Sequence, residues 1–389
     1  MASRIENGDL LNEYLGNKSQ RYPLQGDLIS EASSLDDFIM DKEPIQQRLY
    51  IINRSGSGEA QFVLLNQKRT SIESYGVRYE TWKVTKGISN FGVAVVENVL
   101  YVIGGYDVKT CKHLHRVVKY DPYDFTWTEC SPLLKARAKF GLAVLNGKIH
   151  ICGGERSDGQ AACSCEVYDP GTDTWTDGGV LPAPRKNHSC VLTGSSIYCA
   201  GGDYGLRSHD NFWIYEDGKW AELDQDYPHS LPRCVDRYAM CTVGHKIYFI
   251  GGVSCRVNAA ADDGRFITER GIFSYTLAVS TVRRHKAQGN SLQSEVLSPW
   301  TVRYPSMVRP RHGCAAQAIG RKIYVFGGCH LETGQDVRVC ECFNTDRGTW
   351  EDEFHFRKGD LTNVVTAILE VPRRHDEQKI NYKLKWVLW

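Results

Sequence analysis

Five short apolar runs recur along the chain, and each of them ends in a pair of glycines. The runs are YVIGG at Tyr101–Gly105, HICGG at His150–Gly154, YCAGG at Tyr198–Gly202, YFIGG at Tyr248–Gly252 and YVFGG at Tyr324–Gly328. The first four follow one another every 48 to 50 residues. A fixed period of this length indicates that one supersecondary unit has been copied, as in solenoids and propellers.

One copy, at residues 139–175, predicts four short antiparallel strands. FGLAVL and KIHICGG are each predicted to be a strand, and Asn146-Gly147 between them is a two-residue hairpin signal. CSCEVYD predicts a third strand, and a turn at Pro170–Asp173 leads to an outer strand with Trp175. Such a sheet cannot bury both faces alone, so we expect the copies to pack face to face around an axis as a β-propeller.

Two features of the repeat fit that packing. Glycine lacks a Cβ and permits positive φ, which suits a crowded strand end near the axis. Aromatic residues supply apolar area for the wedge between neighbouring sheets. The expected aromatic pairs are Tyr120/Trp127, Tyr168/Trp175, Tyr215/Trp220, Tyr275/Trp300 and Phe343/Trp350.

A sixth, degenerate copy precedes the five. Arg48–Arg54 (RLYIINR) is predicted to be its second strand, with Asn53 and Arg54 where the glycines should be, and Tyr75 and Trp82 keep the seven-residue aromatic spacing. This copy lacks an inner strand, and Leu361–Val371 (LTNVVTAILEV) at the other end supplies one. The prediction is an all-β, six-bladed propeller whose first blade is closed by a C-terminal strand, which leaves no open sheet edge.

The domain organisation follows from the extent of the repeats. Residues 46–372 are predicted to form the propeller. Residues 1–45 show no repeat and are expected to be mostly disordered, and residues 373–389 form a C-terminal tail.

The ordered pattern NGKIYxxGG, variable loop, VxxYDPxxxxW resembles the kelch repeat, over roughly residues 48–371. The resemblance to kelch-like proteins implies a protein-interaction propeller, the substrate-recognition module of a cullin-type ubiquitin-ligase adaptor. Full-length adaptors place BTB and BACK domains ahead of the propeller, and residues 1–45 are too short to hold them. The chain is therefore expected to be a fragment or isoform, or to bind a separate BTB scaffold. Other kelch proteins are associated with actin, so a cytoskeletal role stays open.

Strand alternation predicts which loops share a face. The loops that follow the glycines and those that follow the Trp should meet around one mouth of the channel, and loops on a rigid scaffold usually carry function. In kelch-like adaptors corresponding positions hold a peptide of the partner protein. The candidate partner-binding residues are Asn90, Tyr106, Lys139, Glu155, Asn187, Tyr204, Arg207, Arg237, Arg256, Arg311 (paired with His312), His330 and Asn363. Acidic Glu155 and Asp203 make this set mixed in charge, which argues against a strongly acidic peptide.

The fifth blade departs from the repeat in two places. Its loop at Val253–Arg270 is longer than its counterparts and is expected to overhang the mouth. Its connection at Leu277–Leu297 carries the basic run Arg283–Lys286 and is expected to be a mobile docking or modification loop on the opposite face. That run is also a candidate contact with actin filaments.

Charge and motifs exclude several classes of function. The formal charge is +1, so no field of the whole protein points to nucleic acid or to a membrane. The fourteen cysteines form no CxxC pair, and their scatter indicates reduced core thiols in a cytoplasmic protein. Cys163/Cys165 and Cys340/Cys342 are assigned to blade packing and not to a metal. No nucleophile motif or phosphate loop is present and the twelve histidines are dispersed along the chain, so no cofactor and no enzymatic activity are expected.

Overall fold

The computed structural model describes residues 45–205, 207–222, 230–256, 265–277, 284–286, 293–295 and 298–372. These residues belong to one compact unit, Glu43–Trp389. The predicted N-terminal segment, apart from Ile45, and the predicted C-terminal tail lie outside the described residues. Among those that are described, no helix has the length and apolar character that crossing a membrane requires.

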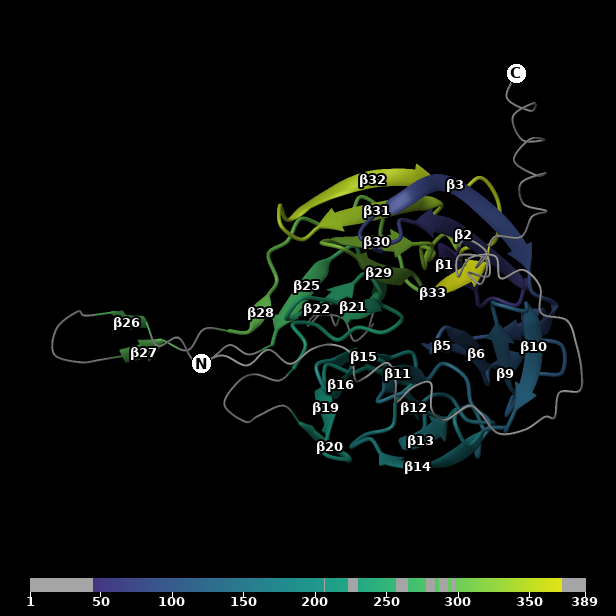
Figure 1. Ribbon diagram of the computed structural model, residues 1–389. Helices are drawn as coiled ribbons and strands as arrows, with labels where there is room; N and C mark the ends of the chain where they lie inside the picture. The colour runs from purple at the N-terminus through teal and green to yellow at the C-terminus, as the bar shows by residue number, and fades with distance from the viewer. Residues whose placement is uncertain are drawn as a thin grey trace, which may run out of the picture. The chain divides into compact units, whose positions relative to one another are not determined.

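Six four-stranded antiparallel sheets form the blades, which we number in chain order, and Figure 1 shows them arranged around a common axis. From the axis outward, blade 1 consists of β33 (Val364–Pro372), β1 (Ile45–Asn53), β2 (Glu59–Leu65) and β3 (Ile72–Thr81). In the same direction, blade 2 consists of β5 (Gly92–Val96), β6 (Val99–Ile103), β9 (Val117–Asp121) and β10 (Thr126–Cys130). Blade 3 consists of β11 (Gly141–Leu145), β12 (Lys148–Cys152), β13 (Ser164–Asp169) and β14 (Thr174–Val180).

The remaining three blades have the same order of strands. Blade 4 is β15 (Ser189–Thr193), β16 (Ser196–Ala200), β19 (Phe212–Glu216) and β20 (Lys219–Glu222); blade 5 is β21 (Ala239–Val243), β22 (Lys246–Ile250), β25 (Ile272–Thr276) and β28 (Trp300–Thr301). Blade 6 is β29 (Ala315–Ile319), β30 (Lys322–Phe326), β31 (Val339–Asn344) and β32 (Thr349–His355). The six-bladed all-β fold is therefore confirmed.

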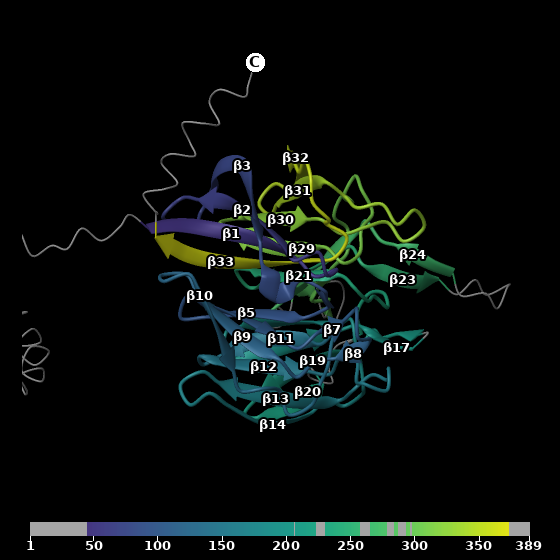
Figure 2. The same cartoon turned by 90° about the vertical axis from the view of Figure 1, so that its right-hand side faces the viewer.

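The C-terminal strand closes blade 1, as the sequence predicts. β33 pairs with β1 in an unbroken antiparallel register from Ile45 opposite Pro372 to Asn53 opposite Val364. Figure 2 shows the two strands side by side although they come from opposite ends of the propeller sequence. The circle of blades is thus held shut by backbone hydrogen bonds between the first and last strands.

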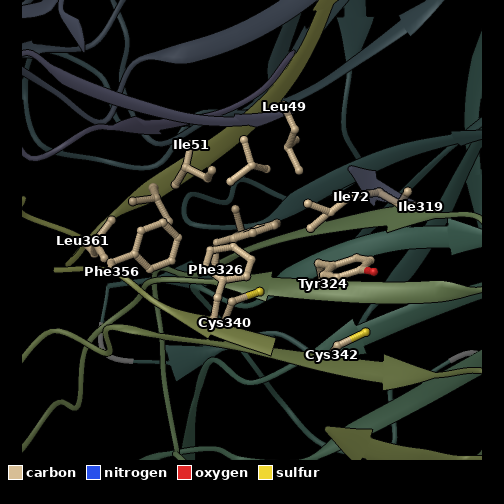
Figure 3. Packing of buried hydrophobic residues seen from close by; sticks show 14 of the residues in the cluster. Leu49, Ile51, Ile72, Ile319, Tyr324, Phe326, Cys340, Cys342, Phe356 and Leu361 are labelled. Carbon is tan, nitrogen blue, oxygen red and sulfur yellow. The ribbon is translucent and has the colours of Figure 1, made fainter. Parts of the chain in front are cut away.

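Apolar side chains fill the interfaces between blades. Between blades 6 and 1, Leu49 and Ile51 of β1 lie in one cluster with Phe326 of β30 and Cys340 of β31, all fully or almost fully buried (Figure 3). The predicted aromatic pairs also form. Their ring centroids are 5.0 Å apart for Tyr120/Trp127, 4.9 Å for Tyr168/Trp175, 5.2 Å for Tyr215/Trp220, 4.9 Å for Tyr275/Trp300 and 5.1 Å for Phe343/Trp350.

The prediction of a Tyr75/Trp82 pair in blade 1 is wrong. Residue 75 lies within the outer strand β3, and Trp82 follows that strand directly, ahead of a short 3-10 helix, η2 (Lys83–Thr85). Leu65 opposite Ile72 occupies the position of the aromatic pair, with the same seven-residue spacing. Trp82 instead packs against blade 2, with its ring centroid 5.4 Å from that of Trp127. Two aliphatic side chains have replaced the pair, so the aromatic spacing misled the prediction.

We letter the four strands of each blade A to D from the axis outward. The B–C connections within blades and the D–A connections between blades meet on one side of the sheets. Small hairpins extend the B–C loops, and Figure 2 shows the labelled ones projecting in the same direction. They are β7 (Tyr106–Asp107) with β8 (Lys112–His113), β17 (Asp203–Tyr204) with β18 (Arg207–Ser208), and β23 (Val253–Arg256) with β24 (Arg265–Thr268). In blades 2 to 6 each B–C loop bridges to the D–A segment beside it, as β7 does to β4 (Ile88–Ser89).

Both insertions of blade 5 are only partly described. Residues 257–264 of the B–C loop lie outside the described residues, and so do the side chains of Arg256 and Arg265. In the connection at Leu277–Leu297, the backbone forms a hairpin of β26 (Arg284–Lys286) and β27 (Gln293–Glu295). The expected mobility and docking role of this connection stay predictions.

The glycine pairs are required by crowding at the ends of the second strands. Gly104 has φ +57°, and a Cβ there would lie 2.7 Å from the carbonyl oxygen of Arg137 in the D–A connection that leads to blade 3. Gly147, in the β11–β12 turn, has φ +72°, but a Cβ there would meet nothing within 4 Å. Gly104 is therefore restricted by its backbone conformation and by space, whereas Gly147 is restricted by its backbone conformation alone.

We predict that Gly104→Ala destabilises the propeller much more than Gly147→Ala. The left-handed conformation costs a non-glycine residue about 1–2 kcal/mol at either site, and the clash with a backbone oxygen adds about 1–3 kcal/mol at Gly104. Chemical denaturation of the two variants measures the difference. Equal losses of unfolding free energy would contradict the role of crowding.

Candidate functional site

A closed ring of backbone hydrogen bonds surrounds the axis at the mouth where the B–C and D–A connections meet. In blades 2 to 6 one residue just before the inner strand has a left-handed backbone, and it donates its N–H to the carbonyl of the corresponding residue in the preceding blade. These residues are Asn90, Lys139, Asn187, Arg237 and Gly313, with φ of 54°, 56°, 55°, 51° and 64°. The N···O distances lie between 2.8 and 3.1 Å.

Blade 1 completes the ring with two chain segments instead of one. Val364 donates its N–H to the carbonyl of Gly313 at 3.0 Å, and Arg54 donates to the carbonyl of Asn363 at 2.8 Å. The carbonyl of Arg54 then accepts the N–H of Asn90 at 2.9 Å. Arg54 stands where the other blades have a glycine, so the degenerate copy brings an additional cationic side chain to the axis.

The ring encloses the entrance of a cavity of about 270 Å³. Its walls come from all six blades. The lining residues are Arg54, Asn90, Lys139, Phe140, Asn187, His188, Ser189, Arg237, Tyr238, His312, Gly313, Cys314, Cys329, Thr362 and Asn363. None of these described lining residues carries a carboxylate, so the charges on the wall are all positive.

Arg54 is the most distinctive of these charges. One guanidinium nitrogen donates to the carbonyl of Phe91 at 3.2 Å and another to Oδ1 of Asn363 at 3.0 Å, while Nε has no partner. Burial lowers the pKa of Arg54 to about 10, so the group stays protonated at neutral pH. Among the described residues no carboxylate pairs with it. A cation held only by neutral acceptors keeps much of its attraction for an incoming anion.

Lys139 and Glu155 belong to a network beside the cavity. The Lys139 ammonium donates to both carboxylate oxygens of Glu155 at 3.1 and 3.0 Å, and Lys186 and His113 also contact that carboxylate. Burial raises the pKa of Glu155, but the hydrogen bonds from Lys186 and Lys139 outweigh it and leave the pKa below its ordinary value. Glu155 therefore serves to hold two lysines and does not line the cavity.

Arg237 and Asn187 are supported in a similar way. Arg237 Nε donates to Oδ1 of the buried Asp236 at 2.6 Å, and the Arg237 side chain is 36% exposed. Asn187 Nδ2 donates to Oδ2 of Asp203 at 2.6 Å. Burial raises the pKa of Asp203. Both carboxylates stand behind the side chains that face the cavity, so they position those side chains rather than meet a ligand directly.

His312 is a neutral member of the wall. Burial, reinforced by Arg237, lowers the pKa of His312 to about 4. Its Nε2 lies 3.4 Å from Sγ of Cys329. At neutral pH the imidazole therefore contributes hydrogen bonding and no charge.

The candidates on the B–C loops lie away from the cavity wall. Tyr106 in β7 packs against His113 with ring centroids 5.2 Å apart, and Tyr204 in β17 is 54% exposed. Arg207 in β18 is exposed, and His330 Nδ1 accepts the N–H of Glu332 at 3.3 Å. Arg256 is described only as backbone of β23. Tyr106, Tyr204, Arg207 and His330 are therefore not among the residues that line the cavity.

The placement of Arg311 at the mouth is wrong. This side chain is completely buried and pairs with the equally buried Glu341, and it donates to the carbonyls of Gly327 and Val339 at 3.2 and 3.1 Å. Gly313, two residues later, holds the ring position. Arg137 and Arg185 lie at the same place relative to Lys139 and Asn187 and bind the carbonyls of Gly153 and Gly201. The shared spacing, an arginine two residues before the ring residue, could have revealed this structural role.

We predict that Arg311→Met destabilises the propeller by about 3–5 kcal/mol, because the Glu341 carboxylate would remain buried without its cation. Arg309→Met is the control, since Arg309 is partly exposed and lies 3.7 Å from the same carboxylate; it should cost about 0–1 kcal/mol. Urea denaturation measures both. Similar stabilities for the two variants would contradict the structural role of Arg311.

Comparisons with known proteins agree with this architecture. The family model described as the KLHDC2/KLHL20/DRC7 Kelch-repeats domain matches residues 90–266, and the Kelch motif matches residues 310–353. Kelch-like protein 26 of Danio rerio is 26% identical over 295 residues, and Kelch-like protein 36 of Bos taurus is 24% identical over 296 residues.

These two alignments cover 75% of this chain but 44% of each relative, so the chain spans less than half the length of the curated relatives it matches. Among solved structures, the one titled "Structure of YjhT" superposes with a TM-score of 0.58 at 13% identity, over 76% of this chain and 95% of that one, which supports the fold alone. With the repeats, the six closed blades and both family matches in agreement, the chain is a kelch-repeat β-propeller related to the kelch regions of kelch-like proteins.

Proposed function

We propose that the propeller binds a short segment of a partner protein at the axial mouth. The observation that carries this proposal is the cavity wall, which presents Arg54, Lys139 and Arg237 without a lining carboxylate. The segment should therefore carry at least one carboxylate. Electrostatic complementarity of this kind selects the partner and orients it in the site.

The size of the cavity favours an inserted side chain over an enclosed small molecule. At about 270 Å³ it lies just below the range of small-molecule pockets, about 300–1,000 Å³. The neighbouring positions Asn90, Asn187 and Asn363 offer amide groups, which can donate to and accept from the backbone of an extended peptide. The exposed residues of the B–C hairpins would form the rim of the complex. The mechanism is binding without a chemical step.

The relatives give the proposal its setting. We infer that the propeller serves as the substrate-recognition module of a cullin-type ubiquitin-ligase adaptor, because its alignment to kelch-like proteins covers most of the propeller. The BTB region that would contact the cullin would belong to a longer chain or to a separate scaffold protein. The alternative is a cytoskeletal partner that would bind the hairpin of β26 and β27, where the sequence has the basic residues Arg284–Lys286.

We predict that the double variant Lys139→Asn/Arg237→Asn binds its partner with an affinity at least about tenfold lower, as expected when two central cationic side chains are removed. Asparagine already occupies the equivalent left-handed positions 90 and 187, and the Asn187 amide donates to the carboxylate of Asp203 behind it. Asparagine at 139 and 237 can donate to Glu155 and Asp236 in the same way, so the ring should remain folded. Affinity purification from cells, with the full chain, measures the recovery of the partner. Arg321→Asn is the matched control, because Arg321 lies in the β29–β30 turn away from the mouth and is 79% exposed.

The proteins recovered with each variant distinguish the adaptor role from the cytoskeletal role. Cullin subunits or a BTB protein recovered with all variants, and one client lost only with the double variant, would support an adaptor that binds through its mouth. Replacing the acidic residues of the mapped client segment with amides should abolish its recovery as well. If the double variant keeps every partner, the mouth is not the binding site, and actin-associated proteins retained throughout would favour the cytoskeletal role.

A further inference from the structure

The interface between blades 3 and 4 gathers four cysteines and a histidine. They come from four different strands and one loop. The residues are Cys152 in β12, Cys165 in β13, Cys190 in β15, Cys199 in β16 and His188 just before β15. Cys152 stands opposite Cys165 and Cys190 opposite Cys199 in their sheets, so two cross-strand pairs face one another across the interface.

The side chains converge closely enough to share one ion. A ring nitrogen of His188 and the sulfurs of Cys190 and Cys199 all lie within 4.8 Å of one another. Burial raises the pKa of the Cys152 thiol, and the neighbouring thiols of Cys165 and Cys190 raise it further. In a tetrahedral zinc site with Zn–S bonds of about 2.3 Å, the ligand sulfurs are about 3.8 Å apart. The group within 4.8 Å has three members, so the Cys152 side chain would have to move toward His188 and Cys199 to serve as the fourth ligand.

Gly141 lets two of these ligands approach the backbone of blade 3. It is the cross-strand partner of Cys152, and a Cβ there would clash with both Cys190 Sγ and His188 Nε2, at 2.5 Å from each. His188 Nε2 accepts the N–H of Gly141 at 3.1 Å, so this lone pair must leave the backbone to bind an ion. The axial cavity also borders His188, which gives an ion a route to the site.

The other blades carry apolar residues at nearly all the corresponding positions, with one thiol in blade 6. Each ligand is compared with the residues that stand the same number of positions from the glycine pair or from the ring residue of their own blade. His188 corresponds to Phe91, Phe140, Tyr238 and Cys314; Cys190 to Val93, Leu142, Met240 and Ala316; Cys199 to Val102, Ile151, Phe249 and Val325; and Cys152 to Ile103, Ala200, Ile250 and Phe326. Metal-binding side chains have thus replaced the apolar set at this one interface, within the part of the chain that the structure describes.

Arg185 provides a second, independent observation. It is completely buried, and its guanidinium lies 3.5 Å from the ring centroid of Trp213. Arg137 and Arg311, its counterparts, pair with the buried carboxylates of Glu166 and Glu341. Trp213 occupies the place of that carboxylate in blade 4, and Arg185 Nε has no partner. A buried cation needs a compensating negative charge. Among the described residues no carboxylate forms an ion pair with Arg185, although Asp210 lies near enough to raise its pKa.

We propose that His188, Cys190, Cys199 and Cys152 bind one zinc ion in a closed tetrahedral site between blades 3 and 4. Three thiols release their protons to solvent when the ion binds, and the neutral imidazole contributes Nε2 in place of its hydrogen bond to Gly141. Three thiolates and one divalent ion leave a net charge of −1, which Arg185 balances. Because the ligands come from two blades, the ion would fasten those blades together.

Metal analysis of the full chain, purified under reducing conditions, tests the proposal. We expect about one zinc ion per chain, and thiolate-to-metal charge-transfer absorption when Co²⁺ replaces it. Cys190→Val and His188→Phe should lose both signals; they introduce the residue types of blade 2, so folding is expected to persist and circular dichroism verifies it. Cys340→Val, a buried thiol between blades 6 and 1, is the control and should keep both signals.

Thermal unfolding gives a readout that does not depend on the purified metal content. Added Zn²⁺ should raise the midpoint of the metal-stripped wild type and of Cys340→Val, but not that of Cys190→Val. Wild-type protein that stays free of zinc, gives no Co²⁺ thiolate absorption and shows no stabilisation by Zn²⁺ would overturn the proposal. Copper in place of zinc, or zinc lost equally from the control, would overturn it too.

Discussion

The ring of backbone hydrogen bonds around the axis is the constraint on which the rest of the structure depends. Five residues with left-handed backbones pass the ring from blade to blade, and Val364 and Arg54 carry it across blade 1. It is continuous only because β33 pairs with β1 along nine residues, joining the two ends of the propeller sequence. A break at any blade would leave unpaired backbone groups at the crowded mouth.

The same constraint fixes the chemistry of the mouth. Ring residues cannot move without breaking bonds on both sides, so Lys139, Asn187 and Arg237 are presented from a rigid backbone. Behind them, Glu155, Asp203 and Asp236 hold these side chains in place. Preorganisation of this kind lowers the entropy lost when a partner binds. Arg54 adds a charge that only the degenerate blade can supply, because glycine fills the corresponding position elsewhere.

The repeat made the architecture predictable, and departures from the repeat account for the errors. Glycine pairs and aromatic pairs mark blades 2 to 6 because the same crowded strand end and the same wedge recur in each. In blade 1 Leu65 and Ile72 stand at the position of the aromatic pair, so the spacing of Tyr75 and Trp82 does not mark a pair there. The sequence points to Arg311 as a mouth residue because Gly313, which holds the ring position, carries no side chain to mark it.

Contacts between blades were the least predictable feature. The thiols at the interface of blades 3 and 4 are dispersed singly over about fifty residues, and only the stacking of two sheets brings them together. Arg54 could be placed at the end of its strand from the sequence, but its contacts with Phe91 and Asn363 depend on closure by the distant C-terminal strand.

Hydrogen exchange of the ring amides tests most directly whether closure holds the mouth together. The measurement compares the full chain with one that ends at Asn363 and so lacks β33. The account predicts that the amides of Lys139, Asn187 and Arg237 are strongly protected in the full chain and lose that protection together in the shortened one, although none of them contacts β33. Full protection of these amides without β33 would show that the mouth does not depend on the closed ring.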